Sequence, residues 1–110
     1  MKTTEKENHL LIENDQDSIT SFASYLTKHH DEFVAYNVII DIQNYENLRL
    51  DELLGFLELS NVHKKQKKSF VIVNNALHMD KVPEELMVVP TLQEAEDVVQ
   101  MEEIERDLGF

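Results

Sequence analysis

The chain has 110 residues, of which 42% are hydrophobic, and it carries 22 acidic against 10 basic residues for a net charge of −12. This length favours a single domain with its own hydrophobic core, and the absence of cysteine excludes disulfides and thiolate metal sites and favours a cytoplasmic location. No apolar run has the length of a membrane span or signal peptide, and the acidic surface disfavours nucleic-acid binding because phosphates would be repelled.

The hydrophobic pattern predicts strands alternating with helices. Residues 1–7 are polar, and we expect them to be disordered. Strands are expected at 9–14, 37–44, 69–75 and 85–89, and helices at 17–30, 50–63 and 91–105. The order β-α-β-α-β-β-α indicates one α/β domain over 1–110, with a mixed, mostly parallel four-stranded sheet and about three helices. In the second helix, the residues expected to face the core are Leu50, Leu53, Leu54, Leu57 and Val62.

Motifs for catalysis or cofactor binding are missing from the sequence. Two glycines cannot build a phosphate-cradling loop, and there is neither a GxSxG motif nor a cysteine nucleophile. The five histidines have no metal-binding spacing, and we expect them at the surface. The sequence therefore predicts a chain that is not an enzyme and binds no cofactor or metal.

Asp41 is an acidic residue inside the apolar stretch VIIDIQ. Burial between Ile40 and Ile42 would raise the pKa of its carboxyl group, which is the basis for a hydrolase hypothesis. The alternative, which we favour, is that Asp41 lies near a sheet end and accepts hydrogen bonds from backbone or Asn groups.

The C-terminal segment 101–110, MEEIERDLGF, carries an apolar stripe. Met101, Ile104 and Leu108 recur at positions i, i+3 and i+7, and Phe110 follows. Such a tail either packs against the edge of its own domain or docks in a partner's groove, and it would also allow homodimerisation.

The stretch VIIDIQNYENLRLDELLGFLELSNVHKKQKKSFVIVNN, followed by VVPTLQEAEDVV, resembles the STAS family, named for sulfate transporters and anti-sigma factor antagonists. The resemblance rests on the strand acid Asp41 and on a T-x-x-E-A phrase formed by Thr91, Glu94 and Ala95, and it covers about residues 37–100. The part before it is shorter than the family's usual opening pair of strands. The resemblance implies a small STAS-like domain that regulates another protein by binding it.

The hallmark of that family is a D-S-[ST]-G-like turn at the start of the second helix, where a partner kinase phosphorylates the hydroxyl group. Counted from Asp41 without gaps, the turn falls on RLDE (49–52), which has no hydroxyl group, and Ser60 lies too far along the helix. The phosphorylation switch therefore does not carry over. Asp51 either stands in permanently for a phosphate or only stabilises the N-terminus of its helix, and we favour the second interpretation.

The docking face of the family implies a first candidate patch for a protein partner, near the start of the second helix. Its residues are Asn44, Tyr45, Glu46, Asn47, Arg49, Asp51 and Glu52. The apolar stripe of the C-terminal segment is the second candidate patch, formed by Met101, Ile104, Leu108 and Phe110.

The ending EEIERDLGF also resembles small proteins that carry a ribonuclease Z label. The metallo-β-lactamase nucleases behind that label need a histidine-rich metal motif, which this sequence lacks. This resemblance therefore implies an accessory partner of an RNA-processing enzyme, or a misassigned label. The basic run HKKQKK (63–68) would provide the contact, unless its lysines only complement the C-terminal end of the second helix.

Overall fold

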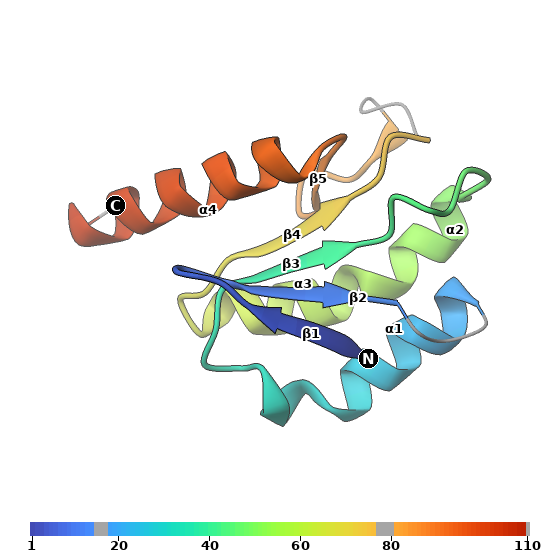
Figure 1. Ribbon diagram of the computed structural model, residues 1–110, viewed down its shortest axis with the longest axis horizontal. Coiled ribbons are helices and arrows are strands. Elements are labelled where there is room, and N and C mark those ends of the chain that lie inside the picture. The colour runs from blue at the N-terminus through green and yellow to red at the C-terminus, as the bar shows by residue number, and fades with distance from the viewer. Residues whose placement is uncertain (15–17, 77–80, 110) are drawn as a thin grey trace.

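A computed structural model describes residues 1–14, 18–76 and 81–109 and has a mixed sheet flanked by helices (Figure 1). The strands found in these ranges are β1 (Lys2–Glu5), β2 (Leu10–Glu13), β3 (Val38–Asp41), β4 (Phe70–Val73) and β5 (Met87–Val89). The helical elements are α1 (Ile19–Lys28), η1 (His30–Glu32), α2 (Leu50–Leu53), η2 (Leu54–Phe56), α3 (Leu57–Lys65) and α4 (Leu92–Asp107). The predicted α/β class is confirmed. None of these helices is both long enough and apolar enough to cross a bilayer.

Within the described ranges the sheet has five strands instead of the four expected, in the order β1-β2-β3-β4-β5. β2 to β5 run parallel, and β1 is antiparallel to β2, with Lys2 opposite Glu13 and Glu5 opposite Leu10. The expectation that residues 1–7 are disordered is therefore wrong. All four side chains of β1 are exposed, so the strand is held through its backbone and leaves no hydrophobic pattern in the sequence. Its charged ends also discourage a further strand from adding to this edge.

The sheet separates two helical layers (Figure 1). Val38 and Ile40 of β3 face the layer formed by α1, η2 and α3, whereas Ile39 faces α4. On the α4 side, Ala95 and Val99 are completely buried against the sheet. The continuous apolar run of β3 therefore reflects burial on both faces of a central strand, as the sequence predicts.

The second predicted helix is interrupted, because the 3₁₀ turn η2 separates α2 from α3. A 3₁₀ turn holds about 3.0 residues against about 3.6 in an α-helix, so it rotates the following residues relative to a continuous helix. Phe56 becomes buried and packs edge to face on Phe22, with ring centroids 6.2 Å apart. Leu54 and Val62, expected to face the core, remain 39% and 42% exposed. Leu53 is buried, and Leu50 and Leu57 are half-buried.

Candidate functional site

The loop from Ile42 to Arg49 lies at the carboxyl-terminal edge of the parallel strands, the edge where α/β sheets commonly bind ligands. Asn74, buried directly after β4, donates its amide to the carbonyl oxygens of Ile42 at 2.8 Å and Tyr45 at 3.0 Å. The side chain of Asn14, directly after β2, donates to the Tyr45 hydroxyl. The loop is therefore tied to the ends of two different strands.

Sequence reasoning did not identify Asn14 and Asn74 as residues that position this loop. The signal they share is an asparagine that directly follows a parallel strand. At that edge the carbonyl and amide groups of the next loop need hydrogen-bond partners, and an asparagine side chain can donate and accept at once.

Asp41 is the last residue of β3 and is half-buried. Its Oδ1 accepts hydrogen bonds from the backbone N–H of Gln43 at 3.1 Å and from the Gln43 side-chain amide at 3.0 Å. Asp41 therefore stabilises the turn that follows its own strand. This is the hydrogen-bonded alternative favoured from the sequence, with glutamine in place of asparagine as the side-chain donor.

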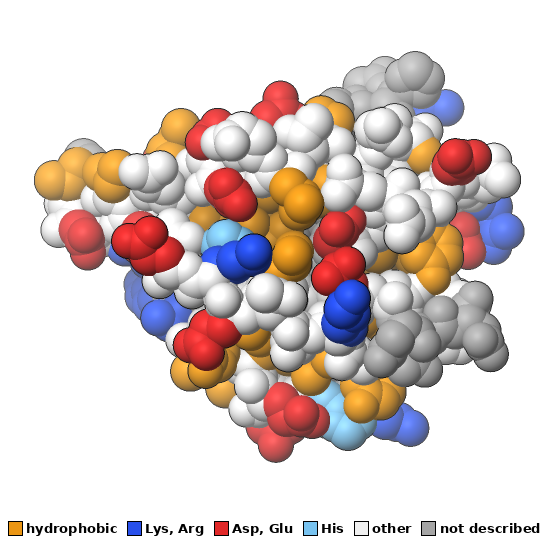
Figure 2. Space-filling view, viewed as in Figure 1, with side chains coloured by type: hydrophobic (Ala, Val, Ile, Leu, Met, Phe, Trp, Pro, Cys, Tyr) orange, Lys and Arg blue, Asp and Glu red, His pale blue; other side chains and the backbone are white. Residues whose placement is uncertain are grey.

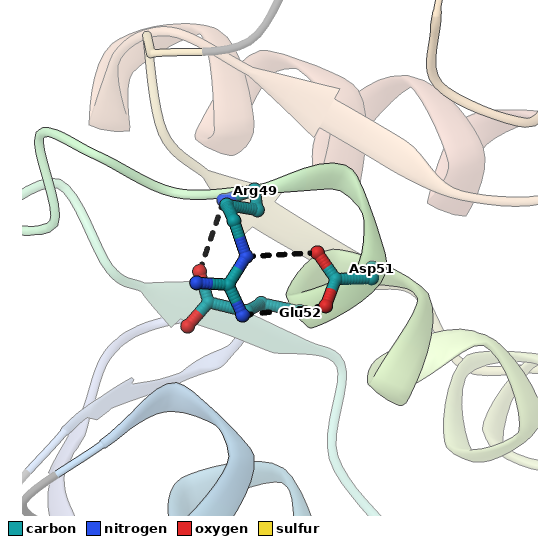
Figure 3. A network of polar contacts seen from close by, with 3 residues as sticks. All are labelled: Arg49, Asp51 and Glu52. Atoms are coloured by element: carbon teal, nitrogen blue, oxygen red, sulfur yellow. Dashed lines mark hydrogen bonds and ion pairs between the residues drawn. The ribbon is translucent and has the colours of Figure 1, made fainter.

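The start of α2 holds a network of three charged side chains (Figure 3). Arg49 donates from Nε to Asp51 Oδ1 at 3.0 Å and from Nη2 to Asp51 Oδ2 at 3.3 Å, a bidentate pair. The backbone N–H of Arg49 donates to Glu52 Oε1 at 3.0 Å, which caps the first turn of the helix. The hydrogen bond from Arg49 lowers the pKa of the Asp51 carboxyl, and the same bond raises the pKa of Arg49. Asp51 is therefore ionised at neutral pH, with its charge partly neutralised by Arg49.

The structure brings most of the first candidate patch together. Six of its seven residues line one shallow depression of about 400 Å³, together with Leu48: Asn44, Tyr45, Glu46, Asn47, Arg49 and Glu52. Asp51 lines a different groove of about 390 Å³ beside α1, whose lining also includes Glu52, Ala23 and Gly55. Arg49 joins the two surfaces through its ion pair with Asp51.

Ser60 is the next hydroxyl group along the chain after the start of α2. Its side chain is fully buried in α3, and within the described ranges its Oγ has no hydrogen-bond partner. A kinase cannot reach this hydroxyl group in the folded chain.

Of the four histidines in the described ranges, His9 and His63 are buried, contrary to the surface location expected for them. His63 Nε2 lies 2.7 Å from the carbonyl oxygen of Tyr36 and must donate to it, so its Nδ1 accepts a hydrogen bond from His30 Nε2 at 2.9 Å. Burial lowers the pKa of His63 to about 4 and also lowers the pKa of His30. His78 lies outside the described residues. Within those residues, no three His, Cys, Asp or Glu side chains are placed to hold a metal ion.

The expected C-terminal tail is the second half of α4, which continues to Asp107. Met101, Ile104 and Leu108 are 59%, 53% and 67% exposed, and Phe110 lies outside the described residues. The second candidate patch is therefore an exposed helix face, not a segment that packs its apolar side chains against its own domain.

The opposite face of this half of α4 holds the helix to the domain through polar contacts. Ser69 Oγ donates to Glu102 Oε1 at 2.5 Å, and Asn37 Nδ2 donates to Glu103 Oε1 at 2.5 Å. Arg106 Nη2 donates to Asn37 Oδ1 at 3.1 Å. Both Asn37 and Ser69 are buried, and they directly precede β3 and β4.

No protein-family model matches the chain, and no curated protein matches it in sequence.

Proposed function

We propose that this chain is a non-catalytic, STAS-like module that binds another protein through a junction surface formed by Asn44, Tyr45, Glu46, Asn47, Arg49, Asp51 and Glu52. One observation carries the proposal: the loop before α2 is fixed to the ends of β2 and β4, yet it leaves Glu46, Asn47 and Arg49 exposed. A surface that is already ordered loses little conformational entropy when it binds, which favours recognition.

The antiparallel β1–β2 pair also supports a STAS-like assignment. It supplies an opening pair of strands, the part for which the sequence is shorter than is usual in the family. Within this proposal, Asp51 orients Arg49 and stabilises the start of α2. Its charge is paired, so it is a weaker stand-in for a phosphate than a bare carboxylate would be.

Reversing the charge of Asp51 tests the junction surface. Asp51→Lys removes the acceptor of Arg49 and places two cations at the helix start, so we expect partner capture to be lost while the melting temperature stays close to that of the wild type. The measurement is a pull-down from native-host lysate read by mass spectrometry. Glu84→Lys is the matched control, because it makes the same charge change at an exposed acid far along the chain. Capture of the same proteins by all three forms would contradict the junction surface.

A second candidate function is supported by one cluster of cations. Lys64, Lys67, Lys68 and Arg106 line a depression of about 230 Å³, together with Glu102 and Glu105. This clustering goes beyond stabilisation of the α3 dipole, for which lysines in the last turn would suffice. It favours the accessory role in RNA processing, with the basic run as the contact.

Replacing Lys64, Lys65, Lys67 and Lys68 together by Gln tests this second candidate. We expect the variant to lose any association with a processing enzyme that depends on RNA, because cations supply most of the affinity for phosphates. The measurement compares capture from lysate with and without ribonuclease treatment. Association that survives the four substitutions removes this candidate.

A further inference from the structure

The inward-facing side chains of α4 are apolar in the first half of the helix and charged in the second half. Ala95 and Val99 are buried against the sheet, and the positions seven residues further on are Glu102 and Arg106. An amphipathic surface helix normally turns its apolar side to the core, and here the second half does the reverse. The cause is the amino-terminal edge of the sheet beneath it, where Asn37 and Ser69 offer polar partners. Figure 1 shows this half of α4 extending past the strands.

These polar contacts fix the rotation of the helix. Ser69 donates its backbone N–H to Asn37 Oδ1 at 2.8 Å, and the same oxygen accepts from Arg106. If α4 rolled to bury its apolar stripe, the buried Asn37 and Ser69 would lose these partners. Leaving a buried polar group unpaired costs about 1–3 kcal/mol, so the stripe is held outward.

The charged side chains that α4 itself places beside the stripe are acidic, whereas Lys64, Lys67 and Lys68 lie on the side of Glu102 and Arg106. Arg106 is the single base of α4 and is bound to Asn37 and Ser69 on the inward side. Asp97 precedes Met101 by one helical turn, and Glu105 follows it by one turn, so both acids border the stripe. The exposed acids of the helix are Glu94, Glu96, Asp97, Glu105 and Asp107. In Figure 2 acidic side chains lie beside the hydrophobic ones at the free end of α4, with basic side chains next to them below.

We propose that the outer stripe of α4, formed by Met101, Ile104 and Leu108, binds an amphipathic helix of another protein whose apolar side is bordered by Lys or Arg. Such a helix buries the three exposed side chains and pairs its cations with Asp97 and Glu105. A second copy of this chain is the less suitable occupant, because two α4 faces would place acids against acids. The proposal rests on the proposed function as a binding module but uses a different surface.

The test measures binding of a synthetic helical peptide by fluorescence anisotropy. The probe has about 18 residues, enough to form a helix, with Leu along one face and Lys on both borders. A control peptide has the same composition with the Leu residues scattered around the helix. We expect the full chain to bind the probe at least about tenfold more tightly than the scattered peptide. We also expect Ile104→Ser to weaken probe binding about tenfold, while Val62→Ser, at another exposed apolar residue, leaves it unchanged.

Three results would overturn the proposal. Equal affinity for both peptides would mean that charge alone attracts the probe, and an unchanged affinity in Ile104→Ser would place binding elsewhere. A dimer in light scattering that Ile104→Ser dissolves would identify a second copy as the occupant. Asp51→Lys should bind the probe like the wild type, so failure of the junction surface and failure of the outer stripe give different patterns.

Discussion

The free energy of unfolding should fall by about 3 kcal/mol through His63 alone as the pH drops from 6.5 to about 4. Burial is the main cause of the low pKa of His63, and the neighbouring His30 and Lys68 lower it further. The unfolded chain, with an ordinary histidine pKa of 6.5, takes up the proton first. The stability that neutral His63 contributes is therefore fully present above pH 6.5. It is lost as the pH falls from 6.5 to about 4, and the loss levels off below the folded pKa.

The hydrogen bonds around His63 explain why its neutral form is required. Nε2 donates to the Tyr36 carbonyl, so only Nδ1 is left to accept from His30. A proton added to Nδ1 would face the N–H of His30, so the bond would be kept only if His30 moved its own proton from Nε2 to Nδ1. Phe33 and Phe70 pack against the completely buried ring, so a charge on it would be poorly solvated. Asp31, beside His30, favours placing a proton on His30 instead.

His63→Gln separates this effect from the other titrating groups. Urea unfolding at several pH values should give a nearly flat stability for this variant between pH 6.5 and 4, apart from the smaller contributions of His9 and His30, whose pKa values burial also lowers. His29→Gln is the matched control, because His29 is a half-exposed histidine paired with Glu32. A slope in His63→Gln equal to that of the wild type would contradict the assignment.

The hydrophobic pattern was sufficient to predict most strands and helices, but not the edge strand β1 or the 3₁₀ turn η2. β3 and β4 are continuous apolar runs, and α1 repeats its apolar residues at helical spacing, so each has a strong local signal. β1 has none, because a strand at the edge of a sheet can pair through its backbone with every side chain in water. The 3₁₀ turn η2 has no sequence signal either, since the burial of Phe56 that it produces depends on packing against Phe22 in the tertiary structure.

At the candidate sites, too, contacts between neighbours in the sequence could be predicted, whereas contacts between distant residues could not. The charged start of α2 is local, so Arg49, Asp51 and Glu52 could be identified from the sequence. The outward direction of the α4 stripe could not, because it depends on Asn37, which lies 69 positions before its partner Arg106. Buried His63 was missed for a similar reason: its partners are His30 of η1 and the Tyr36 carbonyl in the turn after η1, both distant in sequence.

The second large effect should come from Asn37, which connects β3, β4 and α4. Its Oδ1 accepts from Ser69 N and Arg106, and its Nδ2 donates to the Asn8 carbonyl at 3.0 Å and to Glu103. We expect Asn37→Ala to lower the free energy of unfolding by about 3 kcal/mol, because it removes a partner from the buried Ser69 N–H and from three half-buried groups. Urea unfolding measures this loss. Asn47→Ala, at an exposed asparagine, should change stability by less than about 0.5 kcal/mol.

Hydrogen exchange shows whether the stability lost in Asn37→Ala is lost at the end of α4. In Asn37→Ala the amides of 102–107 should exchange faster, because Glu103 and Arg106 lose their anchor, while those near Ala95 and Val99 keep their protection through apolar packing. A loss below about 1 kcal/mol with unchanged protection at 102–107 would mean that other contacts hold the end of α4. The outward direction of Met101, Ile104 and Leu108 would then no longer be enforced by this network. The amides of 102–107 therefore report on the physical basis of the outer stripe, independently of any partner.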